Sequence, residues 1–277
     1  MANFLLYTNT YKDAQLSVTN RVKEYLVSRG AKVACQTHMG EPIERDFTPD
    51  LVLVLGGDGT ILQAVRDPYV PSVPLVGINL GTLGYLSEVE LPSLEPALDR
   101  LLLGDYSVEE RMMLDGRVLR GGVCIDSGWA LNDIVVNRCG SLQILHLKIS
   151  VNGKFLHDYP ADGMILTTPT GSTGYNLSAG GPLATPSAKL IVMTPICPHT
   201  LNQCSIVLAA EDRIAIEIPE GRDGQSQSLE VNFDGNKRLA LMSGDRIEIC
   251  KSEQVTRFAC LNQVSFLEVL HRKMKEN

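Results

Sequence analysis

The sharpest chemical feature of the sequence is Gly-Gly-Asp-Gly-Thr at residues 56–60, directly after the apolar run Leu51–Leu55. Glycines here allow a sharp turn and let backbone N–H groups approach an anion. A following helix would direct its positive end to the same point. Since a carboxylate repels phosphate, Asp58 suggests general-base work on a hydroxyl, or a metal ion that bridges phosphates. A tight strand-to-helix turn, with Asp58 near the helix N-cap, is the alternative.

A second glycine-containing loop is predicted beside the first. The residues Asn-Leu-Gly-Thr-Leu-Gly-Tyr-Leu at 79–86 follow the apolar run Leu75–Ile78. In a doubly wound sheet the loops after parallel strands meet at one edge, so the two loops together indicate a cleft. An ordinary loop, with Leu83, Tyr85 and Leu86 packed beneath it, is the alternative.

A longer polar stretch at residues 162–182 offers the chemistry of a nucleotide site. Asp162-Gly163 and an apolar run precede Thr-Pro-Thr-Gly-Ser-Thr-Gly-Tyr-Asn-Leu-Ser at 168–178. Its hydroxyls and amides are neutral donors and acceptors, and the ring of Tyr175 could lie against a base or a ribose. Uncommitted loops of this length are unusual in compact domains, although a surface loop without a ligand would look the same.

The pair Asn132-Asp133 precedes the strand-like run Ile134–Val136. A neighbouring amide and carboxylate can hydrogen-bond the vicinal hydroxyls of a ribose. A turn at the entry of a strand would also explain the pair.

The elements that would position these motifs change character along the chain. Up to about residue 110, apolar runs alternate with helical patterns, which predicts an α/β domain with a doubly wound parallel sheet. Ligands of such sheets bind outside the carboxyl ends of the strands. The predicted strands are 4–7, 32–35, 51–55 and 75–78, and the predicted helices lie between Val18 and Gly30, at 60–66 and at 94–103.

Residues 115–257 are predicted to form a largely β domain. The dipeptides Asp115-Gly116, Asn152-Gly153 and Asp234-Gly235 each lie between strand-like runs, and such dipeptides favour hairpin turns. Residues 213–218 alternate apolar and polar side chains, as a half-buried strand does.

The C-terminal stretch 262–275 turns helical again, and we expect it to pack back onto one of the domains. Val264, Leu267, His271 and Met274 have the spacing of one helix face. We therefore expect an α/β domain over 1–112, joined by the tail helix 262–277, and a β-rich domain over 113–261.

The composition indicates a folded protein and argues against nucleic acid and membranes as partners. The chain has 277 residues, of which 44% are hydrophobic and 21% charged, so it is a folded protein of about two domains. A net charge of −7 argues against nucleic acid as a partner, and the basic residues 271–273 are interpreted as a solvated helix end. No apolar run reaches the roughly 20 residues of a membrane span, and Met1-Ala2-Asn3 lacks the basic start of a signal peptide. We expect a cytoplasmic protein without membrane partners.

The number and spacing of the cysteines agree with the expected cytoplasmic location. The seven cysteines are an odd number and are scattered without a Cys-x-x-Cys pair. We expect reduced thiols and no structural zinc site.

Taken together, these motifs resemble those of the NAD kinase family. The likeness comprises residues 56–60, 79–86, 132–133 and 162–178, in this order, and extends over most of the chain from 50 to 240. The Gly-Gly-Asp-Gly element is shared with lipid kinases and phosphofructokinases, so the stretch at 162–182 discriminates. The family fold implies an α/β domain and a β domain, with the active site between them.

The resemblance implies transfer of the γ-phosphoryl group of ATP, as its magnesium complex, to the 2′-hydroxyl of the adenosine ribose of NAD. Asp58 would accept the proton of that hydroxyl. It also implies a homodimer or homotetramer, in which part of the site can come from a neighbouring subunit. A divalent metal would arrive with the nucleotide, and no ligand set within the chain is evident.

The residues that the resemblance assigns fall into two groups. The phosphate loop would be Gly56, Gly57, Gly59 and Thr60. The NAD-binding residues would be Asp58, Gly59, Asn132, Asp133, Asp162, Thr173, Gly174, Tyr175, Asn176, Leu177, Ser178 and Asn236.

Three positions depart from the family pattern. Asp133 stands where the family often has Glu, Pro160 where many members have a basic residue, and Gly174 where many have Ala.

Two other functions share parts of the pattern. A lipid or sugar kinase could use the same glycine loop, but a lipid kinase would need an exposed apolar groove that the sequence does not show. A dinucleotide-sensing module would bind NAD or NADP without turnover. The sequence does not decide whether polyphosphate can replace ATP as the donor.

Overall fold

The structure is a computed structural model, and its chain divides into two compact units. Unit 1 comprises Met1–Glu110 and Thr256–Asn277, and unit 2 comprises Arg111–Val255. The described residues are 2–38, 40–43, 47–68, 70, 73–82, 84–140, 144–200, 204–221, 224–261 and 265–275.

Unit 1 is built on a parallel sheet whose strands are ordered β2-β1-β3-β4. β3 and β4 are buried along their whole length, as continuous apolar runs in a two-sided sheet must be. β5 (Ser87–Glu90) and the last residues of β17 (Asp245–Cys260) pair with β4 in the same sheet. The four predicted strands are confirmed, as β1 (Asn3–Thr8), β2 (Lys32–Gln36), β3 (Leu51–Gly56) and β4 (Leu75–Asn79).

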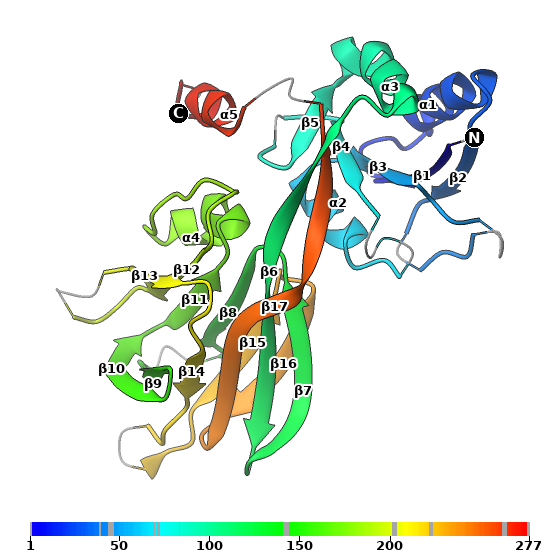
Figure 1. Cartoon of the computed structure of the whole chain (residues 1–277). Coiled ribbons are helices and arrows are strands. Elements are labelled where there is room, and N and C mark those ends of the chain that lie inside the picture. Colours follow the sequence, from blue (N-terminus) through cyan, green and yellow to red (C-terminus); the bar gives the residue numbers. More distant parts are fainter. Residues whose placement is uncertain are drawn as a thin grey trace. The chain divides into compact units, whose positions relative to one another are not determined.

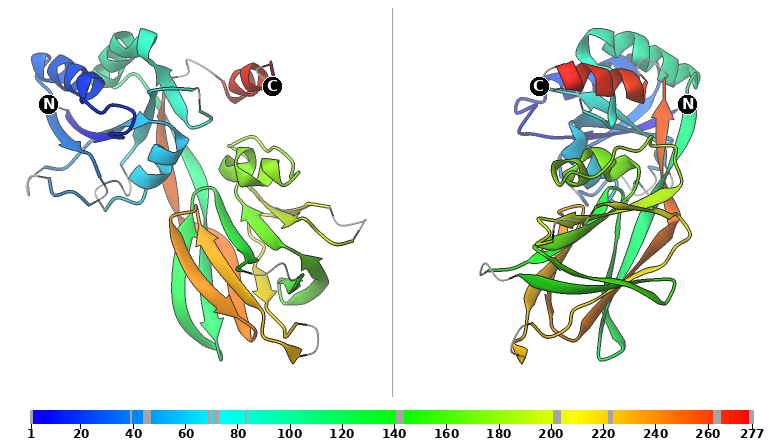
Figure 2. Two further views of the ribbon diagram at one scale, coloured as in Figure 1. Left: turned by 180° about the vertical axis from the view of Figure 1, so that it is seen from behind. Right: turned by 90° about the vertical axis from the view of Figure 1, so that its left-hand side faces the viewer.

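Helices cover both faces of this sheet. α1 (Ser17–Ser28) and α3 (Leu94–Leu103) lie on one face, and α2 (Asp58–Ala64) lies on the other (Figures 1 and 2). The short 3₁₀ helix η1 (Leu91–Ser93) directly precedes α3. The predicted helix at 94–103 is confirmed, and Gly104 ends it with a φ of 72°. α2 begins two residues earlier than predicted, which makes Asp58 its first residue.

The C-terminal helix α5 (Phe266–Lys275) belongs to unit 1, but the predicted face is wrong. Leu267 and Met274 are 64% and 71% exposed, whereas Val269 is buried. The inward face also includes the partly buried Phe266, whose ring lies 6.3 Å from that of Tyr85. Val264 lies outside the described residues.

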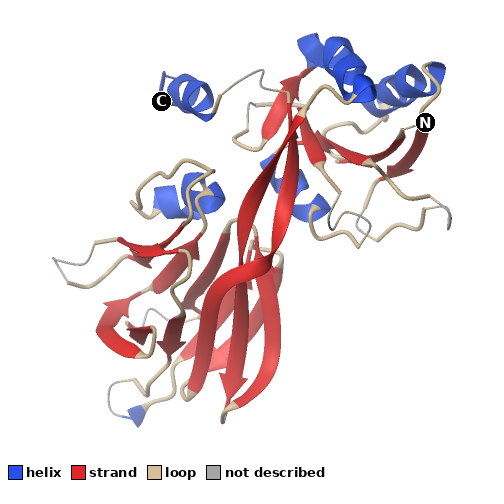
Figure 3. Ribbon diagram, in the orientation of Figure 1, coloured by secondary structure: helices blue, strands red, loops and turns tan. Residues whose placement is uncertain are grey.

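Unit 2 consists mostly of strands in two sheets (Figure 3). Side chains from both sheets, among them Leu114, Ile149, Met164 and Phe233, form one hydrophobic core. One sheet contains β6 (Ser107–Arg120), β7 (Val123–Ala130), β9 (Leu145–Val151), β10 (Lys154–Ala161), β14 (Ile214–Glu217) and β17. The other has the order β13-β12-β11-β8-β15-β16, with β8 (Asp133–Arg138), β11 (Gly163–Thr167), β12 (Leu190–Ile196), β13 (Ile206–Ala209), β15 (Ser228–Phe233) and β16 (Lys237–Met242).

Two of the three predicted hairpin turns are confirmed. Asn152-Gly153 joins β9 to β10, and Asp234-Gly235 joins β15 to β16. The turn predicted at Asp115-Gly116 is wrong, because β6 continues through both residues. A Cβ at Gly116 would lie 2.8 Å from the ring of Phe233, so this glycine makes room in the core instead of a turn.

All seven cysteines are free. Among the described residues, no helix is both long and apolar enough to cross a bilayer.

Candidate functional site

The two glycine loops of unit 1 meet at the carboxyl ends of β3 and β4. The backbone N–H of Leu80, in the second loop, donates to the carbonyl oxygen of Gly56 at 3.0 Å. Asp58 completes the connection, because its Oδ2 accepts from the N–H of Tyr85 at 2.8 Å and its Oδ1 from that of Leu86 at 3.1 Å. The carboxylate is thereby fixed in orientation at the sheet edge where the sequence predicts a cleft.

Gly84 makes this contact possible. A Cβ at Gly84 would lie 2.0 Å from Oδ1 of Asp58 and 2.7 Å from its Cγ. Any side chain at this position would displace the carboxylate. The second loop is thus shaped to receive Asp58.

The predicted phosphate loop has a similarly close fit. A Cβ at Gly56 would lie 2.3 Å from Oγ1 of Thr60, and that hydroxyl accepts the N–H of Gly57 at 3.4 Å. Gly59 is exposed, and a Cβ there would meet nothing within 4 Å. The loop is therefore a compact backbone turn closed by Thr60, with an open side at Gly59.

In unit 2, Asp234 holds the backbone that carries Asn132 and Asp133. Its Oδ1 accepts the N–H groups of Asn132 at 2.8 Å and Asp133 at 3.0 Å, and its Oδ2 accepts that of Leu131 at 2.9 Å. From its sequence context, Asp234 is expected only as a turn residue. A positive φ of 51° at Asp234 is the conformation that an Asp in such a turn adopts, but the carboxylate contact has no signature in sequence.

The side chains of Asn132 and Asp133 meet the 170–178 loop. A Cβ at Gly174 would lie 3.7 Å from Nδ2 of Asn132 and 3.9 Å from Oδ2 of Asp133, so these three predicted residues lie together. Oδ1 of Asn132 is buried and has no hydrogen-bond partner within the described part of the chain, and the same holds for Oγ1 of Thr170. Unsatisfied buried acceptors cost free energy, and they are found where a ligand or a water supplies the donor.

Asp133 is 8% exposed. Burial, and secondarily the neighbouring Asp234 carboxylate, raise the pKa of Asp133 to about 7. A carboxyl group so poised can donate or accept a hydrogen bond near neutral pH, which suits contact with a hydroxyl.

The 170–178 loop is made of η2 (Thr170–Thr173) and α4 (Tyr175–Ser178). Two threonines that precede it, for which the sequence predicts no role, anchor it to the backbone just before β8. Oγ1 of Thr168 donates to the carbonyl of Leu131 at 2.6 Å, and Oγ1 of Thr167 donates to that of Asn132 at 2.9 Å. Thr168 also accepts the N–H of Gly171 at 3.1 Å.

The predicted loop residues differ in what they offer. Asn176 is fully buried, and its amide bonds the carbonyls of Ser172 and Pro182 and the hydroxyl of Thr194, so it holds the loop together. Tyr175 and Leu177 are 47% and 41% exposed. The remaining predicted residues are the half-buried Thr173, which donates to the carbonyl of Thr170, and the exposed Ser178.

Asn236 lies in the turn that also carries Asp234. Its side chain is exposed and donates to the carbonyl of Asp234 at 3.2 Å. The carboxylate of Asp234 links this turn to Asn132 and Asp133.

Asp162 is the predicted residue that the structure keeps apart from this cluster. Along β11, Thr167 pairs with Asp133, whereas Asp162 precedes Gly163 at the other end of the strand. Five residues of extended chain separate Asp162 from Thr167, or roughly 16 Å. The carboxylate of Asp162 pairs with Arg138 at 3.2 Å and His199 at 3.6 Å.

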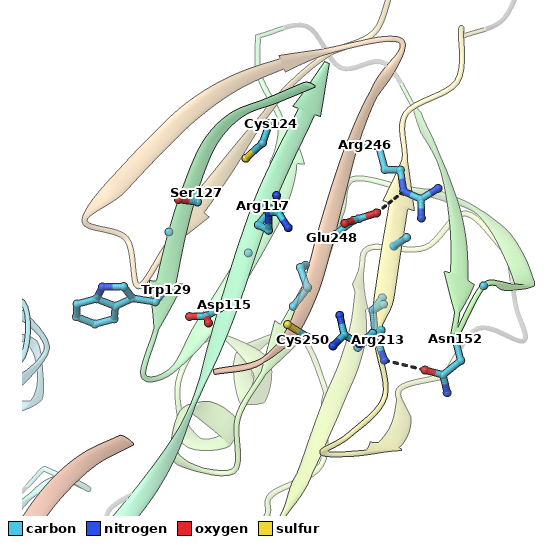
Figure 4. Close-up of a pocket in the computed structure, with 16 residues that line it drawn as sticks. Asp115, Arg117, Cys124, Ser127, Trp129, Asn152, Arg213, Arg246, Glu248 and Cys250 are labelled. Carbon is cyan, nitrogen blue, oxygen red and sulfur yellow. Dashed lines mark hydrogen bonds and ion pairs between the residues drawn. The ribbon is translucent and has the colours of Figure 1, made fainter. Parts of the chain in front are cut away.

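A hollow of about 750 Å³ lies on the outer face of the sheet that contains β6, β14 and β17. None of the residues predicted to bind substrate or phosphate lines it. Figure 4 shows Asp115 and Arg117 on β6, Cys250 on β17 and Arg213 just before β14 around it. Its Arg246 is committed to ion pairs, with Glu217 at 3.1 Å and Glu248 at 3.2 Å.

Comparison with protein families gives two matches that together cover most of the chain. Residues 4–106 match the ATP-NAD kinase N-terminal domain, and residues 131–261 match the ATP-NAD kinase C-terminal domain.

Individual proteins similar to this chain over nearly its whole length are also NAD kinases. The NAD kinase of Lachnospira eligens is 42% identical over 293 residues, which cover 99% of this chain and 100% of that protein. The NAD kinase of Citrifermentans bemidjiense is 38% identical, with 99% of each chain covered.

Two solved structures have the same fold. The NAD kinase of Archaeoglobus fulgidus in complex with ATP has a TM-score of 0.79 at 26% identity, with both chains fully covered. Yeast NADH kinase complexed with NADH has a TM-score of 0.83 at 24% identity, covering 100% of this chain and 88% of that one.

Proposed function

The chain belongs to the NAD kinase family, and we propose that it transfers the γ-phosphoryl group of ATP to the 2′-hydroxyl of the adenosine ribose of NAD. The observation that carries this proposal is the Asp58 carboxylate, fixed by the N–H groups of Tyr85 and Leu86 at the edge of a parallel sheet. A carboxylate beside glycines that would bind phosphate can accept a proton from a substrate hydroxyl, and the ribose hydroxyl supplies one.

Asp58 would act as the general base. As the oxygen of the 2′-hydroxyl attacks phosphorus, its proton passes to a carboxylate oxygen of Asp58, and ADP leaves with the bridging oxygen. Two backbone donors hold the carboxylate without occupying all its lone pairs, so it can still accept that proton. A positioned base contributes roughly 10²- to 10⁴-fold to a rate, and alignment of the reactants contributes the rest.

The cluster around Asn132 and Asp133 would hold NAD. The amide of Asn132 and the carboxyl of Asp133 are close enough to bind neighbouring polar atoms of a ribose or an adenine. The exposed ring of Tyr175 offers a flat apolar surface for a base. Gly174 leaves the space beside both polar side chains open.

Magnesium would arrive with ATP. Among the described residues, no three His, Cys, Asp or Glu side chains gather in a way that could hold a metal ion. Mg²⁺ is commonly bound largely through substrate phosphates and water instead of a dedicated cage of protein ligands, so it would reach the site as the ATP complex. The ion would neutralise charge on the transferring phosphoryl group.

Asp162 fits the family expectation that part of the site comes from a neighbouring subunit. Asp162 lies at the opposite end of β11 from the residue that pairs with Asp133. We propose that in a homodimer or homotetramer Asp162 contacts the NAD that another copy holds.

The test is an assay in which the product is detected by an NADP-specific dehydrogenase. The purified chain is given NAD and either ATP with Mg²⁺ or polyphosphate. We expect NADP with ATP, abolished by EDTA, and a large loss of kcat in Asp58→Asn. Turnover of diacylglycerol but not NAD, or tight NAD binding with no product from either donor, would contradict the proposal.

A further inference from the structure

A lysine that no motif includes lies between the two glycine loops of unit 1. It follows β1, in a turn that is tied to the first loop. Asn9 anchors the turn, because its backbone N–H donates to the carbonyl of Leu55 at 2.9 Å and its Nδ2 donates to Oγ1 of Thr60 at 3.0 Å. The carbonyl of Asn9 in turn accepts the N–H of Lys12 at 3.0 Å. Lys12 is thus held in register with the phosphate loop.

The ammonium group of Lys12 reaches both glycine loops. A Cβ at Gly57 would lie 2.9 Å from Nζ of Lys12, and one at Gly81 would lie 3.5 Å from the same atom. Nζ therefore occupies the space that side chains at these positions would fill. The two glycines leave room for a cation as well as for a ligand.

Lys12 has no ion pair or hydrogen bond for its ammonium group among the residues that the structure describes. Its side chain is exposed. Neither loop, 56–60 or 79–86, contains a basic residue, and the chain as a whole has a net charge of −7. A polyphosphate that enters this acidic protein would therefore meet an uncommitted positive charge at Lys12.

Lys12 also lies at the edge of the parallel sheet where open α/β sheets bind their ligands. The chain leaves β1 toward β2 on one side and leaves β3 toward β4 on the other. The crevice between the carboxyl ends of β1 and β3 is thus the topological switch point of the sheet. Lys12 follows β1 and Asp58 follows β3, so a cation and a carboxylate flank that crevice.

We propose that Lys12 binds the phosphate oxygens of the phosphoryl donor above Gly57 and Gly81. Its charge stabilises the negative charge that spreads over the transferring phosphoryl group, while the backbone of the loops supplies neutral donors. The proposal rests on the proposed function and adds a donor-binding residue to it.

The test compares Lys12→Met, Lys12→Arg and the control Lys23→Met. Lys23 is an exposed lysine of α1, so its loss changes the net charge equally. Steady-state kinetics would be measured with ATP and NAD varied separately, and ATP binding by calorimetry. Since a hydrogen bond to a charged group contributes roughly 1.5–3 kcal/mol, we expect kcat/KM for ATP to fall on the order of 10- to 100-fold in Lys12→Met.

Three further results are expected. The KM for NAD stays unchanged, ATP binding weakens in Lys12→Met, and Lys12→Arg keeps part of the activity because it keeps the charge. A lysine that merely supports the turn would instead lower the melting temperature and alter both substrates alike. Normal kcat/KM for ATP in Lys12→Met, or an equal loss in Lys23→Met, would overturn the proposal.

Failure of the two proposals can be told apart. If the wild type makes no NADP but calorimetry shows ATP binding that Lys12→Met loses, the NAD kinase reaction is wrong and Lys12 still binds phosphate. If the wild type makes NADP and Lys12→Met does so equally well, only the role proposed for Lys12 is wrong.

Discussion

Replacement of Gly84 by alanine tests the role of Asp58 without touching Asp58 itself. The new Cβ would lie 2.0 Å from Oδ1, where an ordinary contact begins at 3.4 Å. The carboxylate must therefore retreat by about 1.4 Å, and a misplacement of about 1 Å can cost on the order of 100-fold in rate. We expect Gly84→Ala to lower kcat by this order and to leave the KM values for NAD and ATP nearly unchanged.

A double-mutant cycle makes the prediction specific. If Gly84→Ala acts only by moving Asp58, it should cost little further activity in an Asp58→Asn background. The assay is initial-rate NADP formation for the wild type, both single variants and the double variant, with melting temperatures as the control for folding. The reasoning is refuted if Gly84→Ala is folded and fully active, or if its cost is as large without the Asp58 carboxylate as with it.

Two other predictions concern stability and pH. The pKa of Asp133, raised from 3.8 to about 7, means that the folded protein holds a proton that the unfolded chain releases. The free energy of unfolding should therefore fall as pH rises from about 4 to about 7, by at most about 4 kcal/mol. Urea unfolding at pH 5 and pH 8 should show at most about 3 kcal/mol of this loss in the wild type and none of it in Asp133→Asn. Asp13 behaves oppositely: burial raises its pKa, but hydrogen bonds from Thr19, Val18 and Ser17 outweigh burial and lower it. Its stabilising effect is present above the ordinary carboxyl pKa and is lost at lower pH, so Asp13→Ala should lower the free energy of unfolding by about 1–2 kcal/mol at pH 7 and by less at pH 3.

The features that sequence predicts well depend on short-range physics. Continuous apolar runs as short as Leu51–Leu55 favour strands buried on two faces, and Gly104 ends a helix because it adopts a positive φ readily. The meeting of the loops at 56–60 and 79–86 follows from the direction of parallel strands.

The features that sequence misses depend on contacts between distant residues. The dipeptide that contains Gly116 predicts a turn, but the glycine is required because the ring of Phe233 packs against it. The tail helix has apolar residues in two overlapping series, and only packing against Tyr85 selects the one with Phe266 and Val269.

The parts of the candidate site that sequence misses have the same origin. Asp234 reaches Asn132 and Asp133 across about 100 residues of sequence, and no local pattern marks such a contact. Lys12 is an ordinary exposed lysine until the strand order brings it to the glycine loops.

The most direct test of the central claim is a structure of the chain with NAD and a non-hydrolysable ATP analogue, from which one distance is measured. We predict that a carboxylate oxygen of Asp58 lies about 2.6–3.2 Å from the 2′ oxygen of the adenosine ribose, or is joined to it by one water. An Asp58 carboxylate that still faces Tyr85 and Leu86, with the 2′ oxygen beyond the reach of a single water, would contradict the account.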